Sequence, residues 1–514
     1  MSFLDDIIGA FAPGMALDRV RARMALDKLR EYEAARPGNR RVESWRRRDA
    51  GPQGEVARGA SDVRRLVRDL LRNNGYATRA HRKLVSATIS TGITGAVLDA
   101  KGRPASAALR DTWNRYVDEA DWCGEHDLYG LQMLIARAVY SDGEALLRRY
   151  RTSFDANTRT PPFRWQVLEV DHIDAGKFDL VRGAADNGFI DRGIEYDARG
   201  RKVALWLYPD HPQNLTPYLR SRFESERVPI GEVVQIYDTL RPGQDRGVSI
   251  FSPAIMPLSD LADYLTKEAM RKSIEAALAV FITTPENPDQ GGLTLGAGAG
   301  SDAASTDGAG NTLSRLMPGM ITRLKPGEAV DPGPVAPVGD MSPFVQQMGF
   351  LAAAGVGVMY EHMTGDFRNV NYSSFRVGSF DFGQFIEQQQ WLVFGQRMCR
   401  PMAQGFTEGV AALGISGAAG VNLRWTPPNP VVSPDPEKDA RADKLQVEML
   451  VKAPSEISGA RGWQHGEMLE RIAADMLAAD AALPPGSRST ADPRNPKAGT
   501  APAPAPNQEN PPNA

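Results

Sequence analysis

The stretch YEHMTGDFRNVNYSSFR, Tyr360–Arg376, connects two long apolar segments through a polar loop at Thr364–Asn371. The segment before it, Ser342–Tyr360, is dense in Ala and Gly and predicts a helix that other helices can approach very closely. A helix packed against other subunits and an ordinary buried helix explain that composition about equally well. The segment after it, Tyr372–Ala412, predicts a long helix. Pro401 should bend this helix, because proline removes a backbone hydrogen bond and clashes with the preceding turn.

The sequence before this stretch falls into regions of different patterning. Apolar residues recur at helical spacing over residues 61–142, with a break at Asn73–Gly75. Residues 143–250 predict a β-rich domain, because short runs of β-branched and aromatic residues alternate with turn dipeptides. Those runs are Glu144–Tyr150, Arg164–Val170, Ile190–Tyr196, Val203–Tyr208 and Val233–Tyr237. Helical spacing returns at Pro253 and continues to about Ala279.

The two ends of the chain offer less from which to build a core. Residues 1–60 include a basic, polar stretch, Arg36–Arg48, and predict an arm that orders on a partner or stays loose. Lys438–Met476 predicts helices. Pro484–Ala514 is rich in Pro, Ala and Asn with almost no apolar anchors, and it predicts a disordered tail.

One internal segment interrupts the helical pattern. Residues 285–311 include GGLTLGAGAGSDAASTDGAG and are dominated by Gly, Ala, Ser and Asp. A stretch of this length without structure is unusual inside a compact domain, so we expect a flexible surface excursion. Short strands are predicted on either side of it, at Val280–Thr283 and Met320–Leu324.

The composition is that of an ordinary folded protein. The chain has 514 residues, of which 42% are hydrophobic, and typical domains have roughly 150 residues. Its formal net charge is −3, whereas proteins that grip DNA tightly usually carry a basic excess. Two cysteines, Cys123 and Cys399, make no disulfide framework, and the histidines show no zinc-binding spacing. The best membrane candidate, Gly349–Tyr360, is far shorter than the ~20 residues of a spanning helix, and the first residues lack the basic region of a secretion signal.

A search for catalytic motifs finds none, which favours a structural or binding role over an enzyme. The sequence contains no GxxxxGK[ST] phosphate loop and no GxSxG elbow. Gly95–Gly102 has its glycines and lysine in the wrong order for a phosphate loop and is interpreted as a turn. Glu169 and Asp171 are interpreted as ordinary surface groups, and Glu361–His362 as a polar pair at the end of a loop. No catalytic residue, cofactor or metal site is expected.

Four stretches in series resemble the lambda-type family of phage portal proteins. The first is LVRDLLRNNGYATRAHRKLVSATISTGITG, Leu66–Gly95, and the second is IYDTLRPGQDRGVSIFSPAI, Ile236–Ile255. The third is LKPGE at Leu324–Glu328 followed by Phe350–Pro401, which contains Tyr360–Arg376. The last is WTPP at Trp425–Pro428, followed by DPEKDARAD. The order of these motifs matches the family over about residues 61–475.

The resemblance implies an α+β, multidomain, helix-rich portal fold with wing, stem, clip and crown. Such subunits form a ring, as a rule a dodecamer, at one capsid vertex. In chain order the implied regions are an N-terminal arm (1–60), the wing (61–250), a stem helix (251–279), the clip with its Gly-rich insertion (280–341 and 285–311), a second stem helix (342–362), a tunnel loop (363–371), a long wing helix with an extended segment (372–433), the crown (434–480) and a disordered tail (481–514).

The resemblance also implies a channel for packaging and ejecting DNA. The candidates for touching DNA in the tunnel loop are Arg368, Asn369 and Asn371. The candidates for lining the channel from the first stem helix are Lys267, Arg271 and Lys272, for which pairing between subunits is an equally good explanation. A near-neutral chain suits a sliding polyanion, because strong phosphate pairing would hold it fast.

The partners that the resemblance implies are other copies of the chain, the terminase large subunit, a head–tail adaptor or connector, the major capsid protein and double-stranded DNA without sequence specificity. No membrane is implied, and the implied location is the capsid vertex of the virion, with the host cytoplasm during assembly. Two other classes remain open. A nucleic-acid-binding protein that uses Arg36–Arg48 would bind DNA tightly and with strong salt dependence. Another capsid-associated protein, such as a head–tail adaptor, would generally be much shorter.

Overall fold

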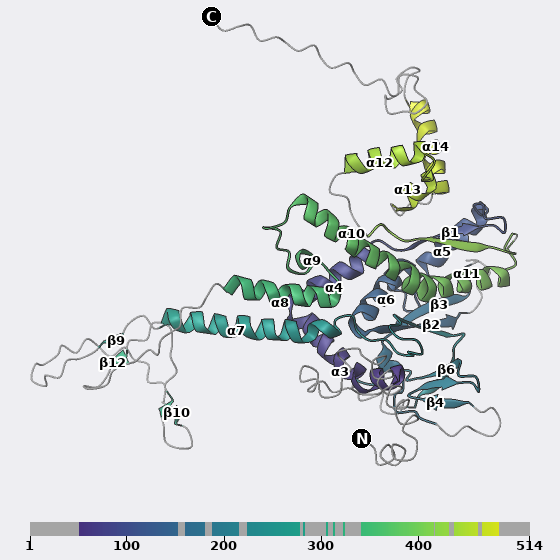
Figure 1. The fold of residues 1–514 in the computed structure, drawn as a ribbon. Helices are drawn as coiled ribbons and strands as arrows, with labels where there is room; N and C mark the ends of the chain where they lie inside the picture. Colours follow the sequence, from purple (N-terminus) through teal and green to yellow (C-terminus); the bar gives the residue numbers. More distant parts are fainter. Residues whose placement is uncertain are drawn as a thin grey trace, which may run out of the picture. The chain divides into compact units, whose positions relative to one another are not determined.

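The computed structural model describes residues 51–152, 160–179, 188–214, 224–277, 341–415, 417–430, 436–460 and 465–482, with four two-residue strands between residues 281 and 323 (Figure 1). The chain divides into two units, Met1–Glu55 and Val56–Ala514, and only residues 51–55 of the first are among those described. The basic stretch Arg36–Arg48, nearly all of the insertion 285–311 and the tail after Ala482 lie outside the described residues.

Most of residues 51–142 are helical, as their apolar spacing predicts. The helices are α3 (Pro52–Asn73), α4 (Gly75–Thr88), α5 (Ala107–Asp118) and α6 (Leu128–Asp142). The expected break after α3 is confirmed, because the Asn74 side chain caps α4 by accepting hydrogen bonds from two of its first backbone N–H groups. Helix α3 begins at Pro52, earlier than the helical spacing over residues 61–142 predicts. Proline is tolerated in a first helical turn, where its missing N–H leaves no bond unmade.

Residues 143–250 form two antiparallel sheets, so the β-rich prediction is confirmed. One has the order β3-β2-β8, with β2 (Glu144–Arg151), β3 (Phe163–Leu168) and β8 (Val233–Tyr237). The other runs in sequence order through β4 (Phe189–Asp191), β5 (Ile194–Tyr196), β6 (Lys202–Leu207) and β7 (Glu226–Pro229). A separate small core fills the space around these strands and includes Leu146, Ile194, Leu205 and Val233.

The single strand expected at Ile190–Tyr196 is instead a hairpin of β4 and β5. Arg192 and Gly193 both have positive φ, 49° and 77°, which gives a two-residue loop the twist that antiparallel strands favour. The strand expected at Arg164–Val170 ends earlier, at Leu168, because the short helix η2 (Val170–His172) follows it.

Two segments far apart in the sequence pair to form a two-stranded sheet. β1 (Thr94–Leu98) pairs antiparallel with β13 (Asn422–Thr426), and Gly95 lies opposite Trp425. A Cβ on Gly95 would lie 2.9 Å from the Trp113 ring, so the position needs glycine for space. The interpretation of Gly95–Gly102 as a turn is therefore wrong for its first half, which is a strand.

The long helix expected at Tyr372–Ala412 is observed with a change of pitch inside it. It comprises α10 (Tyr372–Gln388), the π-helical segment η5 (Gln389–Cys399) and α11 (Arg400–Ala412). Pro401 lies at the start of α11, so its missing N–H falls where the wider π turns end. Proline thus accompanies a change of helix type rather than a simple break.

The long helix packs on the main hydrophobic core, whose centre is aromatic. Trp113 meets Phe406 edge to face at 4.9 Å between ring centroids, and Trp165 Nε1 donates to the Tyr116 hydroxyl at 2.6 Å. Gly405 belongs to α11, and a Cβ there would lie 2.8 Å from Trp165. The same core includes residues of α4, α6, α8 and α10, which are therefore held together as one body.

The expected pair of stem helices lies side by side (Figure 1). The first is α7 (Ile255–Ala277), which follows the short helix η4 (Ser252–Ala254), and the second is α8 (Met341–Val356). The prediction that the second helix continues to residue 362 is wrong. Gly357, with φ 78°, ends it, because the left-handed backbone conformation stops a helix. A separate short helix, α9 (Tyr360–Thr364), leads into the loop, so Glu361 and His362 are helical and not at the end of a loop.

The remaining described elements are four two-residue strands and three C-terminal helices. The strands predicted around the insertion are observed as β9 (Phe281–Ile282) and β12 (Thr322–Arg323), which pair in parallel, and β10 (Ser305–Thr306) pairs with β11 (Thr312–Leu313). The C-terminal helices are α12 (Pro436–Glu448), α13 (Pro454–Ala460) and α14 (His465–Ala482). Helix α14 therefore reaches just into the segment predicted as a tail.

Candidate functional site

The α7–α8 pair is anchored at one end and leaves apolar side chains uncovered elsewhere. Its packed contacts include Tyr264 against Phe344, at 4.6 Å between ring centroids, and five buried side chains: Leu258, Leu261, Ala352, Ala353 and Val356. Met256 and Met270 of α7 are each 66% exposed, and Leu351 of α8 is 54% exposed. Two helices alone cannot cover all of one another, so these faces are available to another surface.

The predicted channel-lining residues of α7 have different surroundings. Arg271 is held by Glu268 one turn earlier, with its Nε 2.9 Å from Oε2 and its Nη2 2.5 Å from Oε1. The hydrogen bond from Arg271 keeps the pKa of the Glu268 carboxyl below its ordinary value. Lys267 and Lys272 are exposed. The charge of Arg271 is thus compensated by an acid of its own helix.

The loop after α9 presents one arginine to solvent but pairs it with an acid. Gly365, with φ 75°, ends α9. Arg368 is 84% exposed, and its Nε and Nη2 lie 2.9 and 2.7 Å from the two carboxylate oxygens of Asp366. The hydrogen bonds from Arg368 lower the pKa of Asp366 to about 2. Asn369 is exposed, whereas Asn371 caps α10 by accepting from Ser374 N at 2.8 Å, so its side chain already has a structural role.

Beside this loop lies a basic pocket that the sequence reasoning missed. We use the name "basic pocket" for the hollow of about 780 Å³ lined by Arg72, Asn73, Gly75, Thr78, Arg79, Arg82, Lys83, Ser86, His362, Phe367 and Phe375. Arg79 Nε donates to the His362 carbonyl at 3.1 Å, which links α4 to α9. The signal was present in the sequence, because α4 carries three basic residues at positions i, i+3 and i+4 and no acidic residue.

Electrostatic repulsion shows in the pKa values around the basic pocket. Burial, together with the nearby charges of Lys83 and Arg79, lowers the pKa of His362 to about 4. Burial and the charge of Arg79 likewise lower the pKa of Lys83. His362 is therefore neutral at pH 7, and the positive charge of this site comes from the arginines and lysine of α4 and the end of α3.

Asp171 is not the ordinary surface group expected, because it lies in an ionic cluster beneath α3. Arg64 Nη1 is 2.8 Å from Asp171, and Arg68 Nη2 is 2.8 Å from both Asp171 and Glu169. Burial alone would raise the pKa of Asp171, but the two guanidinium groups hold it below its ordinary value. His211 Nε2 lies 3.2 Å from Glu169. The ligand atoms of Glu169, Asp171 and His211 lie close enough together to bind one cation. Arg68 already supplies that positive charge.

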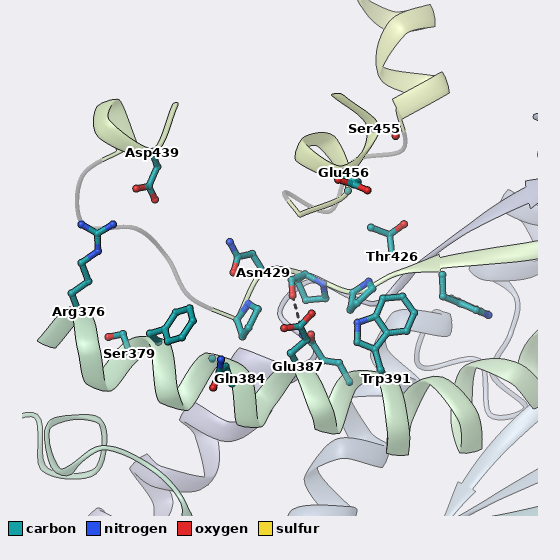
Figure 2. Close-up of a pocket in the computed structure, with 18 of the residues that line it drawn as sticks. Arg376, Ser379, Gln384, Glu387, Trp391, Thr426, Asn429, Asp439, Ser455 and Glu456 are labelled. Carbon is teal, nitrogen blue, oxygen red and sulfur yellow. Dashed lines mark hydrogen bonds between the residues drawn. The ribbon is translucent and has the colours of Figure 1, made fainter. Parts of the chain in front are cut away.

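The long helix borders a groove of about 1080 Å³ (Figure 2). Figure 2 shows Trp391 and Glu387 rising from the helix toward Thr426 and Asn429 on the extended segment, with Glu456 of α13 beyond them. The extended segment is tied down where Gln390 Nε2 donates to the Pro428 carbonyl at 2.9 Å.

The groove exposes large apolar side chains of the long helix. Val377 is 73% exposed, Phe380 65% and Trp391 48%. The opposite face of α10 buries Phe382 and Ile386 in the core. A helix that is apolar on two faces is usually buried on both, so the groove face lacks a cover within this chain's described part.

Comparison with known proteins places these features in a family. The model of the phage portal protein family, lambda family, matches residues 38–390. A probable portal protein of Halomonas phage phiHAP-1 is 23% identical over 491 residues, which cover 88% of this chain and 88% of that protein. The portal protein of Escherichia phage N15 is 22% identical over 369 residues, which cover 65% of this chain and 66% of the relative.

Among solved structures, the neck of a native GTA particle contains a chain that is 12% identical, with a TM-score of 0.35 over 77% of this chain and 92% of that one. At that score the two backbones agree only in part. No helix within the described ranges is both long and apolar enough to cross a membrane.

Proposed function

Because this chain belongs to the lambda family of phage portal proteins, we propose that its copies form a ring, a dodecamer, at one capsid vertex. The central channel of this ring would pass double-stranded DNA inward during packaging and outward during ejection. Within this proposal α7 and α8 are the stem, residues 280–341 the clip, α12 to α14 the crown, and the helices and sheets before α7 together with the long helix are the wing. The loop at residues 365–371 is the tunnel loop.

One observation carries the self-association. Apolar side chains that no other described residue covers lie on several helices, among them α7, α8 and α10, with Met270, Leu351 and Phe380 as examples. Contiguous exposed apolar surface marks interaction sites on folded proteins. Contacts between different faces of identical subunits close into a ring when the rotation between neighbours is right. Several uncovered faces per subunit are what such a ring requires.

The groove beside the long helix fits a second copy better than it fits this chain's own tail or DNA. Residues 484–514 contain no Val, Leu, Ile, Met or aromatic residue, so the tail has little to place against Phe380 and Trp391. The groove lining includes three acids, Glu387, Asp439 and Glu456, against two arginines, which disfavours a polyanion. An apolar surface of a neighbouring subunit remains as the cover.

The tunnel loop suits weak, sequence-independent contact with DNA. Arg368 can approach a phosphate because it is exposed, but its pairing with Asp366 limits the net charge it offers. Strong, uncompensated cations would release counterions and hold the polymer in place. We assign the DNA contact to Arg368 and Asn369. Asn371 sets the start of α10, and Lys267 and Lys272 remain candidates for lining the stem.

The family membership supports the remaining partners. The terminase large subunit would dock on the clip during packaging, a head–tail connector would replace it there afterwards, and the major capsid protein would surround the wing. The mature ring would belong to the virion, and assembly would take place in the host cytoplasm. These assignments do not require an enzymatic activity of the chain itself.

Negative-stain microscopy of the full chain tests the ring. We expect end-on rings with a central hole, and Phe380→Asp should reduce their yield strongly because it places a charge on the uncovered α10 face. Phe178→Asp is the matched control, since Phe178 is 54% exposed but lies among the sheets. Monodisperse monomers of the unaltered protein under all conditions would reject the ring. Rings of Phe380→Asp at normal yield would keep the ring but remove the groove from its interface.

A further inference from the structure

The strongest unassigned feature is the basic pocket, whose lining is polar or cationic apart from Gly75, Phe367 and Phe375. Its charged donors are three arginines and one lysine, and none of its lining residues is an aspartate or glutamate. The Thr78 and Ser86 hydroxyls already donate to backbone carbonyls, so the cations and Asn73 are the groups that a ligand would meet. Phosphate groups are recognised by such clusters of cationic and neutral donors. A hollow intended for a neutral or cationic partner would contain carboxylates or a larger apolar share.

The cations of α4 in this pocket differ from many of the other described arginines in having no acidic partner. Arg64, Arg68 and Arg227, for example, each lie within 2.8 Å of a carboxylate. By contrast, Arg79, Arg82 and Lys83 form no ion pair with any acid among residues 51–152 or the other described segments. Only Arg72, at the rim, meets one, with its Nη2 3.5 Å from Asp69. Three neighbouring positive charges therefore share one face of α4 without internal compensation.

Holding these charges together is unfavourable unless something negative joins them. Their mutual repulsion is visible at Lys83, whose pKa is lowered by burial and by Arg79. Fixed like charges a few ångströms apart cost energy in the empty site, and an anion between them would recover it. The arrangement resembles a preformed receptor, because α4 is capped at Asn74 and packed on the core through Ala77, Ala80 and Leu84.

We propose that the basic pocket binds a backbone phosphate of double-stranded DNA, as a second contact point behind the tunnel loop. This inference rests on the proposed function and adds to it a site on α4 that the loop alone does not provide. Phe367 of the tunnel loop forms part of the pocket wall, and a Cβ on Gly365 would lie 3.0 Å from Arg79. A DNA strand that touches Arg368 would therefore pass close to the basic pocket.

The expected ligand is a phosphodiester in a polymer. The hollow of about 780 Å³ is larger than a single phosphate ion needs, and its cations come from about one turn of α4 and from the end of α3. No base-specific group is evident, because arginine and lysine contacts to phosphate position a duplex without reading its sequence. Binding should therefore be independent of sequence and strongly dependent on salt.

The test compares variants of the full chain, assembled as rings, in binding to a labelled duplex by fluorescence anisotropy over a salt series. Arg82→Gln/Lys83→Gln should weaken binding and make the plot of log affinity against log salt shallower by about 0.9 for each phosphate that the ring no longer neutralises. Arg82→Lys/Lys83→Arg, which keeps both charges, should restore both quantities. Lys101→Gln/Arg103→Gln is the control for an equal reduction of charge outside the pocket.

Three outcomes separate the alternatives, with microscopy of every variant showing whether rings are present. If the pocket and control variants form rings and bind the duplex equally well, the DNA assignment is rejected while the ring stands. If inorganic phosphate raises the melting temperature of the unaltered protein but not of the pocket variant, and duplex binding is unchanged, the site takes a small anion and not DNA. If no preparation forms rings, the proposed function fails, and this inference fails with it.

Discussion

Neutralising Asp366 is expected to turn a weak contact with DNA into a stronger one. Asp366 accepts two side-chain hydrogen bonds from Arg368, which is otherwise 84% exposed. Asp366→Asn keeps the size of the side chain and its ability to accept from the Arg368 backbone N–H. It removes the negative charge, so each subunit gains one guanidinium group that a phosphate can pair with.

The size of the effect follows from counterion release. Each additional phosphate that is neutralised should steepen the dependence of log affinity on log salt by about 0.9. The ratio of the affinity at about 50 mM salt to that at about 200 mM should therefore be roughly 3.5-fold larger, for each such phosphate, than the ratio of the unaltered protein. Fluorescence anisotropy of rings with a labelled duplex would measure both slopes. Asp197→Asn is the matched control, because Asp197 pairs with Arg201 in a turn of the sheet domain.

A slope for Asp366→Asn equal to that of the unaltered ring would refute the reasoning, because it would mean that Asp366 does not restrain Arg368. The double variant Asp366→Asn/Arg368→Gln separates this from an indirect effect. It should fall below the unaltered protein in affinity, since both the acid and the exposed cation are then absent.

Three further predictions concern the stability of the fold. Glu144→Gln should lower the free energy of unfolding by about 3–5 kcal/mol, because Glu144 is fully buried between two guanidinium groups, the nearer at 2.8 Å. Urea unfolding followed by tryptophan fluorescence would measure the change. A decrease no larger than that of the half-exposed control Glu408→Gln would contradict the prediction. The pKa of His362 is about 4 in the folded protein and 6.5 in the unfolded chain. Protonation of His362 therefore lowers the free energy of unfolding as pH falls from about 6.5 to 4, by about 3 kcal/mol in total. In urea unfolding, the stability of His362→Phe should depend less on pH over this range than that of the unaltered protein. Asn371→Ala should cost about 1 kcal/mol by removing the cap of α10, and unchanged hydrogen exchange in the first turn of α10 would count against it.

Local patterns in the sequence predicted the parts of the fold that depend on local physics. The strand at Glu144–Tyr150 was predicted from a short strand-like run bounded by turns, and the break at Asn74 from the Asn73–Gly75 sequence between two helical patterns. The hairpin at Arg192–Gly193 was missed because its two strands have three residues each, so that together they have about the length of one ordinary strand. The strand at Thr94–Leu98 was missed because its partner lies more than three hundred residues later and no local signal specifies that pairing.

The candidate site was predictable only in part for the same reason. Arg368 stands out in the sequence as a charge in a polar loop, but a pairing with Asp366 two residues earlier depends on how the loop turns. The basic residues of α4 have the pattern of an ordinary helical surface, and only the fold brings them beside the loop after α9. Asp171 forms ion pairs with Arg64 and Arg68 of α3, about a hundred residues earlier. Its surroundings could therefore not be derived from its neighbours in sequence.

The pairing of β1 with β13 has a consequence for synthesis. Thr94 cannot find Thr426 until the ribosome has made the next 332 residues, which takes about 17 to 66 s at bacterial rates of roughly 5–20 residues per second. During that interval the edge of β1 that pairs with β13 has no partner, and an unpaired edge can pair with another nascent chain. Polysomes that produce many copies at once would bring such edges close together, so the yield of soluble subunits should improve when fewer ribosomes load on each message.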